Sequence, residues 1–298
     1  MKKYQIILLA AIAVGFSSCK PEFDDEISNG TYTAGEADFS RYVAVGNSLT
    51  SGYMDGTMYR SGQQYSFPNL LSKQFSVVGG GEFTQPSYAD DVNDVGGLLL
   101  GGNVIAQTRM IINMSTGGPQ NIVGTPTIQV GQLQAKAFNN MGVPGAKSFH
   151  LLASGYGNLA GVATGQSNPY FVRMATSPST TVMADAMSMN PTFFTNWIGS
   201  NDVLAYALSG GTGVNQQGNL NPATYGGNDI TDPNVFAQVY STITNGLTAN
   251  GAKGVVATIP YVTSIPHFTT VPYNPLTPEA LGGAAVVGQL NELVGKLK

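Results

Sequence analysis

Two short apolar segments that each lead into a glycine constrain the fold of this chain most strongly. The first, residues 43–46, reads Val-Ala-Val-Gly and is followed by Asn47 and Ser48. The second, residues 193–199, is also apolar, ends on a glycine and leads to Asn201. Such segments are typical of buried strands in parallel α/β sheets, whose ligands bind at the carboxyl ends of the strands. The sequence therefore predicts that Ser48 and Asn201 lie at one sheet edge.

Other segments also favour an α/β fold. A strand is predicted over residues 41–46, and the apolar spacing over residues 68–75 predicts a helix after it. Asp232 followed by proline is a strong helix start, and Gly251 is a helix stop. The β-rich run at residues 254–259 then completes a strand, helix and strand, which implies a parallel crossover.

Two further regions bear on the completeness of the domain. Residues 79–131 are rich in Gly, Asn, Ser and Thr, and we expect them to form an insertion of loops and short strands above the sheet. A last helix is predicted from Thr277, with an apolar face that continues to the final residue. Because a helix in a parallel sheet normally leads to another strand, we expect an incomplete C-terminus.

The N-terminal residues predict export. The apolar run at residues 6–16 is too short to span a bilayer, and it is typical of a signal peptide. The following Ser-Ser-Cys resembles a bacterial lipobox, which implies that residues 1–19 are a lipoprotein signal and that Cys19 is lipidated. This predicts anchoring to the cell envelope, at the outer membrane and facing the periplasm or the surface. The alternative is an ordinary signal peptide, with Cys19 an incidental thiol. Residues 20–38 are acidic and predict a flexible tether, leaving residues 39–298 as one domain.

Charge and composition exclude several classes of partner. The chain has 13 basic and 17 acidic residues and no cluster of Lys and Arg, so nucleic acid is not expected as a partner. Asp90, Asp91, Asn93 and Asp94 lack the remaining ligands of a calcium loop, and we expect a solvated turn there. A phosphate-binding Gly-x-x-x-x-Gly-Lys sequence is also missing, so the sequence predicts no metal and no cofactor.

The residues around Ser48 distinguish between two classes of serine hydrolase motif. The α/β-hydrolase elbow needs a glycine two residues after the serine, where this chain has Thr50. Residues 46–53 and 196–202 instead resemble blocks I and III of the GDSL-type esterases and lipases, the SGNH hydrolase superfamily, although the family has Asp in place of Asn47. The resemblance implies a three-layer, flavodoxin-like parallel sheet. It also implies a serine ester hydrolase that acts through an acyl-enzyme on an exported or surface substrate, such as an acylated glycan or lipid.

The resemblance assigns roles to three residues. It makes Ser48 the nucleophile, while the alternative for this serine is a helix N-cap. The oxyanion donors would be the Ser48 N–H, the Gly142 N–H and the Asn201 side-chain amide. Gly142 lies in a Gly-x-Pro-Gly sequence that is also typical of a plain turn. Asn228 has a similar sequence context, but no apolar strand precedes it, so we choose Asn201.

The general base is the missing element. The family places a histidine three residues after an aspartate near the C-terminus, and neither His150 nor His267 has an aspartate at that position. His267 is a weak candidate base because it follows the third predicted strand, and His150 has an apolar setting that favours a structural role. Either the base lies beyond these residues, or the protein is an inactive surface lipoprotein that binds glycan or another protein.

Overall fold

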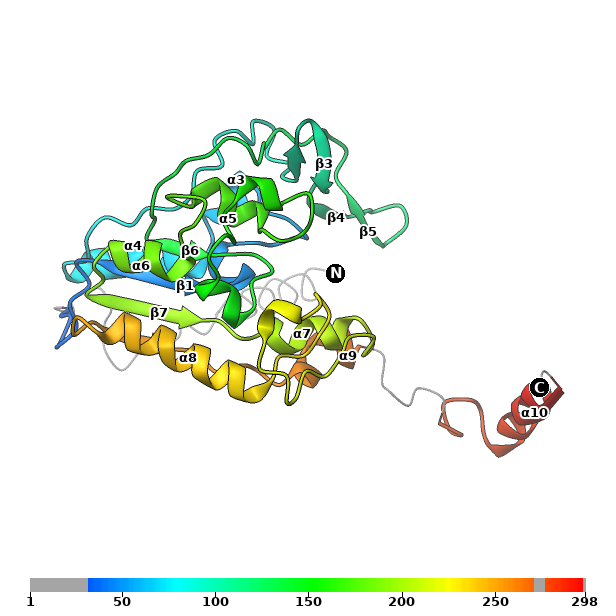
Figure 1. Cartoon of the computed structure of the whole chain (residues 1–298). Helices are drawn as coiled ribbons and strands as arrows, with labels where there is room; N and C mark the ends of the chain where they lie inside the picture. The colour runs from blue at the N-terminus through cyan, green and yellow to red at the C-terminus, as the bar shows by residue number, and fades with distance from the viewer. Residues whose placement is uncertain (1–31, 271–276, 297–298) are drawn as a thin grey trace, which may run out of the picture. The chain divides into compact units, whose positions relative to one another are not determined.

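The computed structural model describes residues 32–270 and 277–296, and its centre is a four-stranded parallel sheet (Figure 1). The strand order is β6-β1-β7-β8, with all three pairings parallel. The strands are β1 (Tyr42–Gly46), β6 (Asn140–Gly142), β7 (Phe193–Trp197) and β8 (Lys253–Val256). The predicted parallel α/β sheet is confirmed, and its order is compatible with a flavodoxin-like fold. The short strand β6 was not predicted, and β8 ends earlier than expected.

Helices cover both faces of the sheet because side chains alternate along β1. Val43 and Val45 point to one face, where they pack with buried residues of α6 and α8 such as Ile243. Tyr42 and Ala44 point to the other face, in a cluster against which α4 packs.

The α-helices are α2 (Ser48–Ser51), α3 (Arg60–Gln63), α4 (Phe67–Phe75), α5 (Pro169–Met174), α6 (Val182–Ser188), α7 (Asn201–Leu208), α8 (Pro233–Thr248), α9 (Pro266–Thr269) and α10 (Ala284–Lys296). The 3-10 helices are η1 (Ser76–Val78), η2 (Ser148–Leu152), η3 (Leu159–Gly161), η4 (Pro222–Thr224) and η5 (Val262–Ser264).

Two predicted helix starts have different outcomes. Asp232 caps α8 as expected, because its side chain accepts the N–H groups of Asn234 and Val235. The predicted start at Thr277 is wrong. Helix α10 begins only at Ala284, since the two glycines before it have φ angles of 86° and 106°, outside the right-handed helical region.

The predicted insertion contains the expected short strands, arranged as two antiparallel pairs. They are β2 (Leu98–Leu100) with β3 (Asn103–Ala106), and β4 (Met110–Ile112) with β5 (Pro119–Asn121). The region has a small core of its own, in which Leu98, Ile128 and Val130 pack with Met58 and with Val172 of α5. Apolar burial therefore fixes the β2–β3 hairpin on α5.

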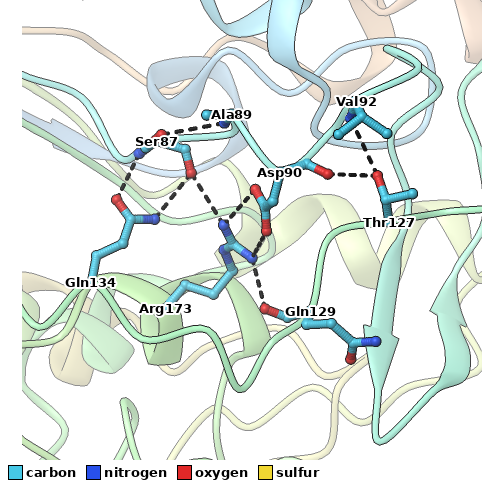
Figure 2. A network of polar contacts seen from close by, with 8 residues as sticks. All are labelled: Ser87, Ala89, Asp90, Val92, Thr127, Gln129, Gln134 and Arg173. Carbon is cyan, nitrogen blue, oxygen red and sulfur yellow. Dashed lines mark hydrogen bonds and ion pairs between the residues drawn. The ribbon is translucent and has the colours of Figure 1, made fainter.

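The acidic run at the start of the insertion is not the solvated turn that the sequence predicts. Asp90 forms an ion pair of 2.8 Å with Arg173 of α5, whose side chain is 3% exposed (Figure 2). The same guanidinium also donates to the carbonyl oxygens of Ser87 and Gln129. Asp91 is buried and accepts a backbone N–H from α3. These carboxylates therefore bond the insertion to neighbouring elements.

The predicted signal peptide and Cys19 lie outside the described residues. Within the described ranges, none of the helices is long and apolar enough to cross a membrane.

Candidate active site

Ser48 follows β1 directly and begins helix α2. The strand ends on Gly46, where a larger residue does not fit, because a Cβ atom would lie 2.0 Å from the Thr50 hydroxyl oxygen. Asn47 caps the helix, since its Oδ1 accepts the Leu49 N–H at 3.1 Å. The N-cap alternative for Ser48 is therefore wrong. The half-buried Ser48 hydroxyl has no hydrogen-bond partner among residues 32–270 and 277–296.

Asn201 and Asp202, the first two residues of α7, both reach the loop that follows β6. Asn201 donates from Nδ2 to the Ala146 carbonyl oxygen at 2.9 Å. Asp202 accepts the N–H and the hydroxyl of Ser148, both at 2.8 Å. Burial raises the pKa of Asp202, while these two hydrogen bonds act in the opposite direction. The block III motif thus fixes the β6 loop, and one amide hydrogen of Asn201 remains for another acceptor.

The two glycines of the β6 loop have different environments. The Gly142 N–H donates to Asn140 Oδ1 at 3.0 Å, and Gly142 is buried so tightly that a Cβ atom would lie 2.3 Å from the backbone nitrogen of Ser51. Gly145 is exposed, has a φ of 77°, and its N–H has no acceptor within the described part of the chain. The donor predicted at Gly142 is therefore already in use, whereas the N–H of Gly145 is available. The sequence spacing alone does not indicate which of the two N–H groups is available.

The sheet brings the three motifs to one edge. Gly46 at the end of β1 pairs with Gly142 on one side and with Trp197 on the other, so the three strands end in one row. Ser48, Gly145 and Asn201 each follow within a few residues of that row. Asn228 lies in a loop after η4 and follows no strand of the sheet. The arrangement places a hydroxyl and amide donors at the same sheet edge, and these are the groups that nucleophilic attack on a carbonyl requires.

Neither histidine is joined to this hydroxyl. His150 lies in η2, where its Nδ1 accepts the Lys147 N–H at 3.0 Å and its ring stacks on Tyr156 with centroids 4.6 Å apart. Burial, assisted by Lys147, lowers the pKa of His150 to about 4. His267 is exposed on the short helix α9, after the η5 turn that packs against α7. In the part of the chain that the structure describes, no hydrogen bond links either imidazole to Ser48.

Among the described residues, no group of three or more His, Cys, Asp and Glu side chains has the arrangement of a metal site.

Comparisons with known proteins add no relative to this description. A scan of protein-family models finds no match, and searches of curated proteins and of solved structures also find none.

Proposed function

We propose that the protein is a serine ester hydrolase of the GDSL type, with an acylated glycan or lipid as substrate. The observation that carries this proposal is the unpartnered Ser48 hydroxyl at the carboxyl edge of β1, next to strands that lead to Gly145 and Asn201. The resemblance of residues 46–53 and 196–202 to two blocks of that family supports the same chemistry. Gly145 takes the place of Gly142 as the donor from the β6 loop.

The reaction follows from these groups. The Ser48 oxygen attacks the ester carbonyl carbon and transfers its proton to a base, giving a tetrahedral oxyanion. The oxyanion accepts hydrogen bonds from the N–H groups of Ser48 and Gly145 and from the free amide hydrogen of Asn201. Its collapse breaks the ester C–O bond, the leaving oxygen takes the proton back from the base and departs as the neutral alcohol, and water then hydrolyses the acyl-serine to the acid and free Ser48. His267 is the candidate base within these residues.

The test is hydrolysis of p-nitrophenyl acetate by the chain, with Ser48→Ala compared against Ser76→Ala, a matched change at an exposed serine. Without a positioned base we expect a slow rate, because losing one triad member lowers kcat by about 10⁴ to 10⁶. That slow rate should disappear in Ser48→Ala and persist in Ser76→Ala. Asn201→Ala should lower it by about 10²-fold or more. Equal rates in Ser48→Ala and the parent chain would contradict the proposal.

One observation favours a second function, a surface lipoprotein that binds glycan or another protein without catalysis. Among residues 32–270 and 277–296, no base is hydrogen-bonded to the Ser48 hydroxyl, and a fold does not by itself determine activity. Labelling by a fluorophosphonate separates the two functions, since it requires an activated serine. Labelling that disappears in Ser48→Ala supports the hydrolase, and a folded protein with neither labelling nor Ser48-dependent ester hydrolysis supports the binding function.

We also propose that the protein is exported and anchored through Cys19, on the evidence of the lipobox-like sequence. The chain should incorporate palmitate in cells and fractionate with membranes, while Cys19→Ala should be released as a non-lipidated form. Equal membrane association of the two forms would show that Cys19 is not the anchor.

A further inference from the structure

A cavity opens beside η2, the 3-10 helix whose first residue, Ser148, is hydrogen-bonded to Asp202. It has a volume of about 540 Å³ and lies between η2, η4 and α8. The lining begins at Phe149, directly after the Ser148 that Asp202 holds. Its size is within the usual range of small-molecule sites. It is lined by residues that the proposed ester chemistry does not use.

Aromatic rings form much of the wall of this cavity. Phe149 and Tyr225 meet edge to face with their centroids 5.5 Å apart. His150 and Tyr156 are stacked nearly parallel, with an interplanar angle of 9°. Each pair holds its partner in place, so the cavity offers flat rings in fixed positions. Aromatic faces carry partial negative charge and attract weakly positive C–H groups.

His150 also supplies a hydrogen-bond donor. Because its Nδ1 accepts the backbone N–H of Lys147, the neutral ring carries its proton on Nε2. The ring stays neutral at ordinary pH, since burial and the nearby Lys147 lower its pKa to about 4. The Nε2–H is then the polar group that His150 can present to a ligand in the cavity.

The remaining polar groups of the cavity are also uncharged. Ser154 and Gln166 line it, and both are exposed. Among the described residues, no Asp, Glu, Lys or Arg lines the cavity. A charged ligand would lose hydration without gaining an ionic partner, which is unfavourable. The lining thus suits a neutral molecule with an apolar face and several hydroxyl groups.

We propose that this cavity binds one pyranose ring of a neutral glycan. The C–H face of the sugar would pack on the ring of Phe149 or Tyr225, and its hydroxyl groups would bond to His150, Ser154 and Gln166. Binding does not depend on a reaction at Ser48. If the hydrolase function also holds, the cavity selects an acylated glycan over a lipid as the substrate.

The test is saturation-transfer NMR on the folded chain with methyl β-D-galactopyranoside and methyl β-D-glucopyranoside. At least one sugar should bind in the millimolar range and receive magnetisation from aromatic protons. Gln166→Ala should weaken binding by about 2- to 10-fold, the range for one lost hydrogen bond. Phe149→Leu keeps an apolar side chain without the flat ring and should weaken binding by a similar factor. Gln132→Ala, which removes an exposed amide from another hollow, is the matched control and should bind as the parent does.

The outcomes distinguish this site from the ester chemistry. Ser48→Ala should still bind the sugar, even where it abolishes esterase activity. Circular dichroism of each variant separates a lost site from a lost fold. Three results would overturn the proposal: no saturation transfer to either sugar, unchanged affinity in both folded cavity variants, or binding of 1-octanol in the absence of sugar binding. The last result would identify an acyl-chain site.

Discussion

Asp202 gives the sharpest test of how the candidate active site is built. Its carboxylate is 2% exposed and accepts two hydrogen bonds from Ser148, at 2.8 Å each. Asp202→Asn keeps the shape of the side chain and replaces one acceptor oxygen with an NH₂ group. That group faces either the N–H or the hydroxyl of Ser148. The hydroxyl can rotate and accept, whereas the backbone N–H can only donate.

The expected cost follows from these contacts. A hydrogen bond to a charged acceptor contributes about 1.5–3 kcal/mol, and a buried donor left without a partner costs about 1–3 kcal/mol. Removing the charge recovers part of this loss, because burial raises the pKa of Asp202 and so disfavours its charged form. We therefore expect Asp202→Asn to lower the free energy of unfolding by about 2 kcal/mol. Ser148→Ala removes only the hydroxyl and should cost about 1 kcal/mol.

Urea unfolding followed by fluorescence measures these values, since the chain has one tryptophan, Trp197, at the end of β7. A double-mutant cycle of Asp202→Asn and Ser148→Ala should give a coupling energy of at least about 0.5 kcal/mol, as expected for residues in contact. The NMR signal of the Gly145 amide should also shift in Asp202→Asn. A loss of stability below about 0.5 kcal/mol, with no coupling, would refute the conclusion that Asp202 fixes the β6 loop.

Three further predictions concern other parts of the fold. Because the pKa of His150 is about 4 when folded and 6.5 in its reference state, the unfolded chain binds a proton first. Stability should therefore fall by up to about 3 kcal/mol as the pH drops through this interval, and urea titrations at several pH values should show a smaller decrease for His150→Asn. Gly142→Ala should prevent stable folding, since its Cβ would lie 2.3 Å from a backbone nitrogen. The Cβ of Gly145→Ala would make only an ordinary contact of 4.0 Å with Asn168 Nδ2, so this change should cost only about 1–2 kcal/mol for its left-handed φ; circular dichroism and urea unfolding would measure both. Arg173→Met should destabilise the protein by about 3–5 kcal/mol by leaving Asp90 without its partner, and the double variant with Asp90→Leu should regain part of that loss in the same unfolding assay.

The parts of the fold that the sequence predicts are those with long local signals. Strands β1 and β7 have five residues each with consecutive buried positions, and α8 has an aspartate cap before proline. Strand β6 has only three residues, beginning with Asn140, and it becomes a strand through pairing with β1. Pairing between distant segments is a tertiary effect that local patterns do not contain.

The residues of the candidate site also divide into those that local sequence predicts and those that depend on tertiary contacts. The spacing of the motifs predicts Ser48 and Asn201, because each follows a strong strand directly. Whether Gly142 or Gly145 is free to donate to an oxyanion depends on which N–H the Asn140 side chain accepts. The positions of two nearby glycines in the sequence do not indicate this hydrogen bond. The acidic residues near Asp90 also resemble a solvated loop until α5 brings Arg173 against them.

Helix α5 connects the insertion to the loop that follows β6. At its N-terminal end, Asn168 caps the helix and donates to the carbonyl oxygen of Pro144, beside Gly145. At the other end, Arg173 is bound to the insertion. Six helical residues span about 9 Å, so the helix works as a short rigid strut. A displacement of the insertion at Arg173 would therefore be transmitted through α5 to the loop that carries Gly145.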